Sequence, residues 1–243
     1  MSDDWLKEMK MLTADECQRA NADLHDLREK WIPRRGPDIP YYTLGAASTF
    51  PEMKSAEGGA EYYAMAKENN PVIKDQFQWV LDRLLSALSE ALGAPANFHE
   101  PFALPGFQIF GSHPGFTKDG MIHSDVQYTF LDWSGFQDVD FANPLAYTMA
   151  IKLPSSGGGL NVWEAEASWN PNLNPPNYDL QKAKEELKTA KKDYIPYEVG
   201  TMVLHSGLRI HQVAGLKNPQ PDDERISLQG HGLFCDGEWK IFW

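Results

Sequence analysis

The C-terminal run 225–234 alternates between polar and apolar residues, which is typical of a β-strand with two different faces. Successive side chains of a strand point to opposite faces, so residues two apart share a face. Ile226 and Leu228 therefore lie on one apolar face, which we expect to pack on helices. The other face should line a polar cavity. It carries Arg225, Ser227, Gln229 and His231.

Short β-like runs occupy most of the chain beyond residue 101. Clusters of Gly, Pro and Asn separate them, a pattern typical of an all-β sandwich or barrel. The expected strands cover residues 106–110, 122–129, 146–153, 159–163, 201–205, 209–213, 225–234 and 239–243, and 41–44 is a candidate edge strand.

Helical spacing appears mainly in the first 100 residues. Thr13 and Glu16 form a Thr-x-x-Glu capping box, and apolar residues at helical spacing then predict a helix to about residue 31, before Pro33. A second amphipathic helix is expected from near Pro71 to Gly93, because Pro is favoured at the start of a helix and Gly just past its end. This second helix should buttress a sheet.

Residues 164–193 interrupt the strand pattern. They are rich in Trp, Asn and Pro up to Tyr178, and then charged with helical spacing over residues 181–192. Long loops in compact domains often act as lids over binding sites. A charged surface helix without a catalytic role explains the insertion equally well.

Composition and charge narrow the class of protein. The 243 residues are 42% hydrophobic and 12% aromatic, enough for the core of one enzyme domain. Asp and Glu number 34 against 22 Lys and Arg, so the formal charge of −12 disfavours nucleic acid or an anionic membrane as partner. We expect a small-molecule or short-peptide substrate. The sequence does not indicate an oligomeric state.

Two cysteines are too few for a disulfide framework. The N-terminal segment is acidic and has no apolar stretch, and no run reaches the length of a membrane span. We therefore expect a cytoplasmic protein.

Three residues suggest a metal site. His123 and Asp125 stand two apart in the run 122–129, so on a strand they share a face, and His211 in the run 209–213 adds a second imidazole. Two histidines and one carboxylate make the facial triad of non-haem Fe(II) oxygenases. A His-x-Asp triplet alone is a weak signal, because a lone histidine in a sheet is more often structural.

Arg225 and Ser227 follow His211 and share one strand face. A guanidinium donates two parallel hydrogen bonds to a carboxylate. This pair could therefore hold a carboxylate ligand.

The order His-x-Asp, distal His and Arg-x-Ser resembles the Fe(II)/2-oxoglutarate-dependent oxygenases. The resemblance covers about residues 100–235. It implies a mainly β fold with flanking helices, whose core is a double-stranded β-helix, or cupin-like jelly roll. Residues 1–243 would form a single domain. Residues 1–100 would give mainly helical support on one outer face, and 101–243 the jelly-roll core with a lid-like insertion at 164–193.

The resemblance also implies the chemistry. His123, Asp125 and His211 would bind Fe(II), 2-oxoglutarate and O2 would be cosubstrates, and Arg225 with Ser227 would anchor the 5-carboxylate of 2-oxoglutarate. The enzyme would be a hydroxylase-type dioxygenase that oxidises an unactivated C–H bond of a small metabolite, amino acid or short peptide and releases succinate and CO2. Desaturation or cyclisation would use the same site. Halogenating relatives have a small residue at the position of Asp125, so its carboxylate predicts a product without halogen.

The sequence leaves the roles of three other polar residues undecided. Gln127 has the strand parity of His123 and Asp125, and either binds cosubstrate or substrate or fills a polar position. Arg209 either binds an anionic group in the cavity or lies exposed at the barrel mouth. His205 competes with His211 as the distal ligand, but the distance to Arg225 favours His211.

Two further classes of protein fit the same pattern. A cupin-type metalloenzyme that does not use 2-oxoglutarate would share the barrel and the triad without needing Arg225 and Ser227. A non-enzymatic ligand-binding jelly roll would keep its ligand after loss of His123 and Asp125.

Overall fold

The structure is a computed structural model that describes residues 6–48, 58–170, 172 and 177–243. Its helices are α1 (Ala14–Asp26), α2 (Gly58–Leu92) and α3 (Leu180–Leu187), with 3-10 turns η1 (Arg28–Lys30), η3 (Pro114–Phe116) and η4 (Gln127–Phe130). Its first strands are β1 (Leu6–Lys10), β2 (Ile32–Pro33), β3 (Tyr41–Leu44), β4 (Ala96–Phe98), β5 (Gly106–Gly111), β6 (Leu145–Lys152) and β7 (Leu160–Glu166). The others are β8 (Ser168–Asn170), β9 (Asn177–Asp179), β10 (Lys192–Ile195), β11 (Thr201–Ser206), β12 (Arg209–Val213), β13 (Glu224–Cys235) and β14 (Glu238–Phe242).

Among the residues described, the strands form a nine-stranded large sheet, a three-stranded small sheet and a two-stranded ribbon. The large sheet has the order β1-β11-β6-β13-β5-β3-β2, and β14 pairs with both β13 and β4. The small sheet is β10-β7-β12, and β8 pairs with β9. All these pairs are antiparallel except β14 with β4. This mostly β architecture is consistent with a jelly-roll core.

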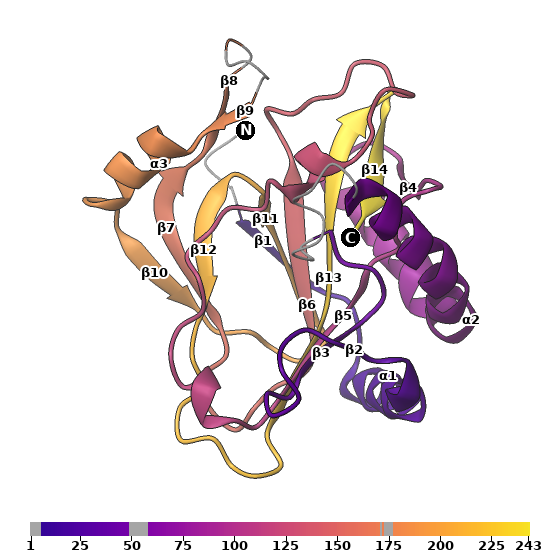
Figure 1. The fold of residues 1–243 in the computed structure, drawn as a ribbon, viewed down its shortest axis with the longest axis vertical. Helices are drawn as coiled ribbons and strands as arrows, with labels where there is room; N and C mark the ends of the chain where they lie inside the picture. The colour runs from indigo at the N-terminus through magenta and orange to yellow at the C-terminus, as the bar shows by residue number, and fades with distance from the viewer. Residues whose placement is uncertain (1–5, 49–57, 171, 173–176) are drawn as a thin grey trace.

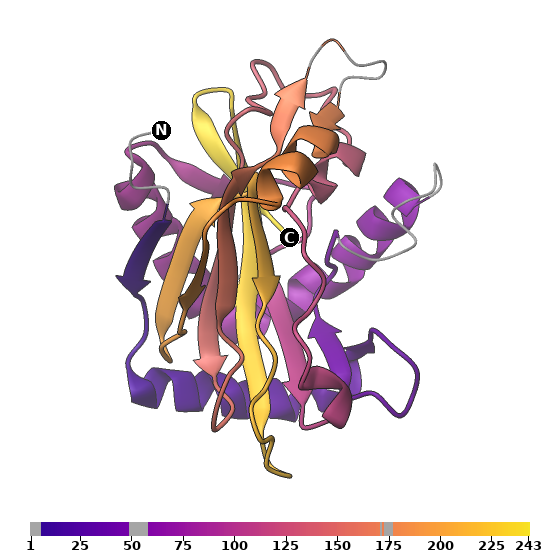
Figure 2. The same ribbon diagram turned by 90° about the vertical axis from the view of Figure 1, so that its left-hand side faces the viewer.

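The outer face of the large sheet is apolar and is covered by helices. Ile226 and Leu228 of β13 are fully buried in one cluster with Phe77 and Val80 of α2 and Leu24 of α1. Figures 1 and 2 show α1 and α2 on the same side of the large sheet, away from the small sheet. The alternation along β13 thus places its apolar side chains against helices, as expected.

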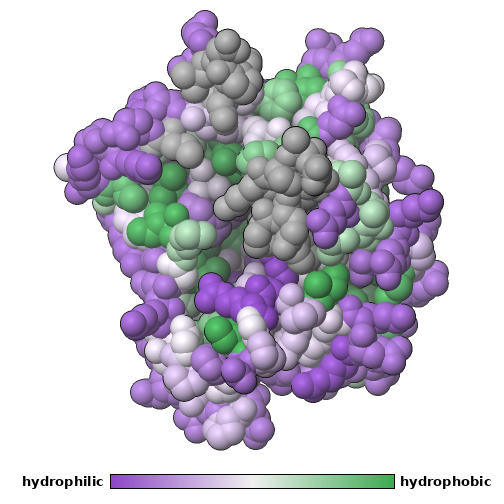
Figure 3. Space-filling view, in the orientation of Figure 1, coloured by the Kyte–Doolittle hydropathy of each residue, from purple (hydrophilic) through white to green (hydrophobic). Residues whose placement is uncertain are grey.

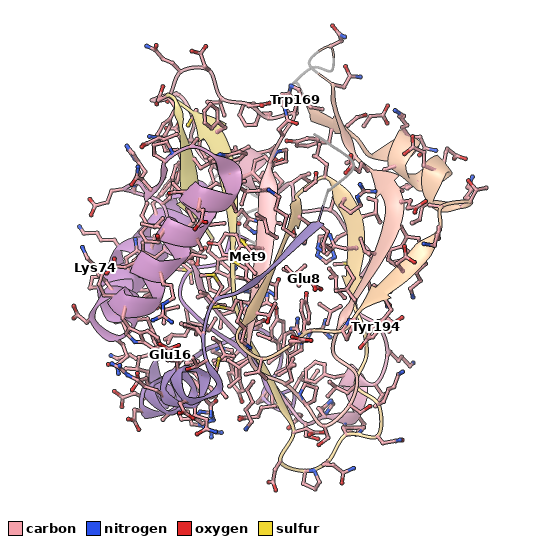
Figure 4. The ribbon with its side chains drawn as sticks, turned by 180° about the vertical axis from the view of Figure 1, so that it is seen from behind. Glu8, Met9, Glu16, Lys74, Trp169 and Tyr194 are labelled. Atoms are coloured by element: carbon pink, nitrogen blue, oxygen red, sulfur yellow. The ribbon has the colours of Figure 1, made fainter. Side chains whose placement is uncertain are left out.

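The inner face of the large sheet is turned towards the small sheet. Ala150 of β6 and Val203 of β11 pack with Leu160 of β7. On β1, Met9 points towards the helices and Glu8 towards the space between the sheets (Figure 4), and Met9 packs against the helix-facing cluster. In the space-filling view the surface is hollowed between the two sheets (Figure 3).

The helix boundaries predicted from Pro and Gly are partly wrong. α1 ends at Asp26 and continues as a 3-10 turn. α2 begins at Gly58 and is kinked at Phe77, which has φ −120° and ψ 16°, so Pro71 lies inside its first part. Pro71 removes one backbone hydrogen bond, but buried side chains on both sides of it, Tyr62 and Ile73, hold the segment in place. Packing therefore outweighs the local preference of proline.

The expected strand at 122–129 is also wrong. His123 forms only an isolated antiparallel bridge with His211, and Val126 has φ −120° and ψ 13°, which turns the chain into η4. Gln127 therefore lies in a 3-10 turn and not on the strand face assumed for it. Its side chain lies outside what the structure describes.

The insertion is shorter than the sequence suggests, because β7 extends to Glu166 and β10 begins at Lys192 and pairs with β7. Between them, α3 contacts β7 and β8. No described helix has the length and hydropathy needed to span a membrane.

Candidate functional site

His123, Asp125 and His211 converge at one place between the sheets. Their potential ligand atoms all lie within 4.8 Å of one another. Asp125 Oδ1 is 3.7 Å from His123 Nε2, and Asp125 Oδ2 is 3.4 Å from His211 Nε2. Within the described residues, no other group of three or more His, Cys, Asp or Glu side chains could hold a metal ion in this way.

Backbone carbonyls orient both imidazoles. His123 Nδ1 lies 2.8 Å from the carbonyl oxygen of Met121, and His211 Nδ1 lies 2.8 Å from that of Arg209. A carbonyl oxygen can only accept a hydrogen bond, so each Nδ1 carries a proton and Nε2 is the ring nitrogen left to bind a metal. Metal-binding histidines are commonly oriented in this way.

Backbone hydrogen bonds position the segment that carries His123 and Asp125. His123 and His211 exchange both backbone bonds, and the Asp125 amide donates to the carbonyl oxygen of Gly207 at 2.8 Å. Gly207 lies in the turn between β11 and β12, where a Cβ would stand 3.1 Å from the Asp125 carbonyl oxygen and 3.3 Å from Pro144. The segment that carries Asp125 therefore packs closely against this turn.

The carboxylate is surrounded by imidazoles. Burial alone would raise the pKa of Asp125, but His211, His231, His123 and His205 outweigh it and lower the pKa to about 2. Burial lowers the pKa of His211 to about 3 despite the attraction of Asp125. Asp125 is therefore ionised and His211 neutral at neutral pH, the protonation states that metal ligands require.

Arg225 lies on the inner face of β13, buried with 2% of its surface exposed. Its Nε donates to the carbonyl oxygen of Gly158 at 3.0 Å, and its guanidinium carbon lies 5.5 Å from the ring of Phe110 and 5.4 Å from that of Tyr197. Neither Nη1 nor Nη2 has a hydrogen-bond partner among the described residues. A buried cation with two unsatisfied donors fits a carboxylate ligand.

Ser227 is buried next to Arg225 along the same face of β13. Its hydroxyl accepts a hydrogen bond from Gln229 Nε2 at 3.4 Å. The structure therefore places Arg225 and Ser227 on one side of the strand, as the sequence predicts.

Arg209 has protein partners. Its Nη2 lies 3.0 Å from Glu166 Oε1, and its Nη1 donates to the carbonyl oxygen of Trp163 at 3.5 Å. A register shift separates Arg209 from His211 on β12. Arg209 is thus engaged by the neighbouring strand β7.

His205 and His231 belong to the surroundings of Asp125. The sequence indicates His205 only as a competitor of His211 for the distal ligand position, and His231 only as a residue of the polar face of β13. Both are 6% exposed, and burial lowers the pKa of each. The rings of His205 and His211 are 4.9 Å apart, yet His205 is not part of the group that converges on one metal position. The alternation of β13 contained the signal for His231, because it shares the face of Arg225.

Tyr178 connects the insertion to the metal-site segment. Its hydroxyl donates to the carbonyl oxygen of Phe141 at 2.6 Å and pairs with the hydroxyl of Tyr128 in η4, three residues after Asp125. The β8–β9 ribbon is therefore fastened to the loop that leaves the site.

The sequence matches no protein-family model and no curated protein. The fold does match solved structures. One is an N-substituted L-amino acid dioxygenase from Burkholderia ambifaria AMMD in complex with alpha-KG, at a TM-score of 0.58 and 13% identity over 98% of this chain and 86% of that one.

Two further matches have lower scores. The epimerase SnoN in complex with Fe3+, alpha ketoglutarate and nogalamycin RO aligns at a TM-score of 0.52 and 11% identity, over 93% of this chain and 77% of that one. AviO1 from Streptomyces viridochromogenes Tue57 aligns at 0.50 and 12% identity, over 93% and 88%. At these identities the likeness concerns the fold.

Proposed function

We propose that this protein is an Fe(II)- and 2-oxoglutarate-dependent oxygenase, built as a single domain over residues 1–243 on a double-stranded β-helix core. Its metal ligands would be His123, Asp125 and His211, and its cosubstrates 2-oxoglutarate and O2. Solved structures with the same fold that contain alpha-KG and Fe3+ support the proposal. So does the convergence of three ligand atoms at one point.

The burial of Arg225, with two guanidinium nitrogens that have no partner among the described residues, is the observation that carries this proposal. The triad alone would suit many metalloenzymes. A guanidinium buried on the inner face, whose Nη1 and Nη2 have no hydrogen-bond partner among the described residues, fits an anionic ligand with two acceptors. The 5-carboxylate of 2-oxoglutarate is such a ligand, and Ser227 on the same face would assist.

The residues of this chain would bind the iron and orient its ligands. His123 and His211 would hold the iron through Nε2, and their Nδ1 bonds to backbone carbonyls would fix the ring planes. Asp125 would neutralise part of the metal charge. Iron with 2-oxoglutarate and O2 supplies the oxidising power for C–H cleavage, and the coproducts are succinate and CO2.

The solved structures with a similar fold also suggest a class of substrate. The related folds include an amino acid dioxygenase and an epimerase crystallised with nogalamycin RO. We infer that this protein oxidises an unactivated C–H bond of a small metabolite, amino acid or short peptide. Hydroxylation is the main expected outcome, and desaturation or cyclisation would use the same site.

Anaerobic reconstitution with Fe(II) and 2-oxoglutarate tests the proposal. The expected result is the weak visible metal-to-ligand charge-transfer band of a chelated 2-oxoglutarate, which Arg225→Ala should weaken at equal iron content. Admission of O2 together with a panel of amino acids and other metabolites should then identify compounds that accelerate succinate release.

Other results would favour the other classes of protein. Iron binding without the band, and without any response to 2-oxoglutarate, would indicate a metalloenzyme of another type. Ligand binding that survives His123→Ala and Asp125→Ala would indicate a non-enzymatic binding protein.

A further inference from the structure

Gly158 lies against the side chain of Arg225. Its carbonyl oxygen accepts the hydrogen bond from Arg225 Nε at 3.0 Å. Its φ is +72°, a backbone conformation that glycine adopts without strain. A Cβ at this position would stand 3.3 Å from Arg225 Cδ and 3.1 Å from Pro154 Cγ. The arginine side chain therefore passes this residue at a distance that leaves little room for any side chain.

Backbone hydrogen bonds hold the glycine turn, residues 157–159, against the segment that continues β12. The Gly158 amide donates to the carbonyl oxygen of Gly215 at 3.3 Å, and the Ala214 amide donates to that of Gly159 at 2.9 Å. The carbonyl oxygen that receives the guanidinium bond is therefore fixed relative to β12, the strand that carries the proposed distal iron ligand.

Two aromatic rings also lie against the guanidinium. Its central carbon is 5.5 Å from the ring of Phe110, which is paired with Arg225 across β5 and β13, and 5.4 Å from the ring of Tyr197. A guanidinium is planar and its donors have a fixed geometry, so the Nε bond sets the direction of the other two nitrogens. Nη1 and Nη2, which have no partner among the described residues, are left for a ligand.

We propose that Gly158 is a positioning residue for the cosubstrate. Its carbonyl oxygen and its lack of a side chain together place the guanidinium of Arg225 so that Nη1 and Nη2 can bind the distal carboxylate of 2-oxoglutarate. The inference rests on the proposed function, because this carboxylate belongs to the proposed cosubstrate. Gly158 acts through Arg225 and needs no contact of its own with the cosubstrate.

Gly158→Ala tests the proposal in protein reconstituted anaerobically with Fe(II). The charge-transfer band is titrated with 2-oxoglutarate and with 2-oxopentanoate, an acid of the same chain length with a methyl group in place of the distal carboxylate. At equal iron content, the Kd for 2-oxoglutarate should rise about threefold to tenfold, less than in Arg225→Ala, because the guanidinium is displaced and not removed. The Kd for 2-oxopentanoate should not change. Unchanged affinity for 2-oxoglutarate, or equal weakening of both acids, overturns the inference.

Gly93→Ala is the matched control for backbone strain. Gly93 follows α2 and has φ +68°, and a Cβ there would meet no described residue within 4 Å apart from its chain neighbours. This variant should lower the thermal unfolding midpoint, as Gly158→Ala does, and leave the Kd for 2-oxoglutarate unchanged. Equal weakening of 2-oxoglutarate binding in both variants would mean that strain alone is the cause, and would overturn the inference.

A double variant tests whether Gly158 acts through Arg225. In an Arg225→Ala background, Gly158→Ala should weaken 2-oxoglutarate binding no further, because the group that it positions is already absent. Further weakening would show that Gly158 affects the cosubstrate by another route, and would overturn the inference.

Arginine side-chain NMR gives a readout that needs no iron. In 15N-arginine-labelled protein, the Arg225 Nε–H signal, assigned by its loss in Arg225→Lys, should exchange slowly with solvent, because this group is buried and hydrogen-bonded. In Gly158→Ala the signal should shift and exchange faster. Rapid exchange in the unmodified protein, or an unchanged signal in the variant, overturns the inference.

The outcomes separate the two proposals. Absence of the charge-transfer band with 2-oxoglutarate in the unmodified protein contradicts the proposed function. A normal band in the unmodified protein, together with an unchanged Arg225 signal or an unchanged Kd in Gly158→Ala, contradicts the role of Gly158 alone.

Discussion

His123 and His211 exchange both of their backbone hydrogen bonds, 3.0 Å from the His123 amide to the His211 carbonyl oxygen and 2.8 Å in the other direction. Two of the three proposed metal ligands therefore position each other through the backbone. Each Nδ1 is also held by a backbone carbonyl oxygen, so groups of the protein orient both imidazoles. We expect metal binding to depend on three side chains and to require little rearrangement.

Removal of any one ligand should abolish tight iron binding, because two donors cannot hold the metal in a fixed geometry. His123→Ala, Asp125→Ala and His211→Ala should each retain little Fe(II) after anaerobic reconstitution and desalting. His205→Ala is the control and should retain nearly the normal amount. Iron lost in His205→Ala and kept in His211→Ala would show that the distal ligand is misassigned.

Arg225 should determine the affinity for 2-oxoglutarate. Charge-assisted hydrogen bonds are worth about 1.5 to 3 kcal/mol each, so Arg225→Ala should raise the apparent Kd for 2-oxoglutarate about tenfold or more at equal iron content. Arg225→Lys should recover only part of the loss, because an ammonium cannot form the two parallel bonds. Titration of the charge-transfer band measures both, and unchanged affinity in Arg225→Ala would contradict the role of Arg225.

Asp125 should prevent halogen transfer. Under the proposed function, its carboxylate would occupy the coordination position that halogenating Fe(II)/2-oxoglutarate-dependent oxygenases leave open for chloride, so the product should contain no halogen. Mass spectrometry of turnover in chloride and bromide buffers checks this once a substrate is known. A halogenated product from the unmodified protein would contradict the assignment of Asp125 as a ligand.

Glu16 should stabilise the protein in a pH-dependent way. Hydrogen bonds from Arg83 first, and then from the Thr13 backbone, lower the pKa of Glu16 from 4.5 to about 2. The folded state thus favours the ionised form, so the stabilisation is complete above pH 4.5 and is lost as the pH falls towards 2.

Denaturant unfolding of Glu16→Gln tests this. Its unfolding midpoint should lie below that of the unmodified protein at pH 7, and the gap should narrow at about pH 3.5. Glu90→Gln, at an exposed carboxylate of α2, is the matched control and should behave like the unmodified protein at both pH values. If the difference between the two unfolding midpoints did not depend on pH, the ionised form of Glu16 would not be what stabilises the folded protein.

Tyr178→Phe should destabilise the protein although it preserves the ring. The change removes buried hydrogen bonds to the Phe141 carbonyl oxygen and the Tyr128 hydroxyl. Unsatisfied buried groups cost about 1 to 3 kcal/mol each, which urea unfolding can measure. Tyr194→Phe, at a residue 48% exposed, should change little. Equal effects of the two substitutions would show that the Tyr128–Tyr178 pair does not fasten the insertion.

The sequence alone predicts most strands, because alternation with period two is a local property. The predictions for β3, β5, β6, β11, β12, β13 and β14 are confirmed to within two residues at each end. The polar face of β13 is predicted for the same reason, since Arg225, Ser227 and His231 need only their spacing to share a side. The sequence also predicts the grouping of His123, Asp125 and His211, through their residue types and their order along the chain.

Tertiary structure decided what depends on contacts between distant segments. Pro71 remains inside α2 because buried residues on both sides hold the helix. Val126 ends the extended segment, so Gln127 lies in η4, whose Tyr128 is buried in a cluster with Trp133. The arrangement of His205 and His231 near Asp125 could not be predicted either. It follows from the register of three strands, which places these two histidines on either side of Ala146, and register is a relationship between strands that no single strand encodes.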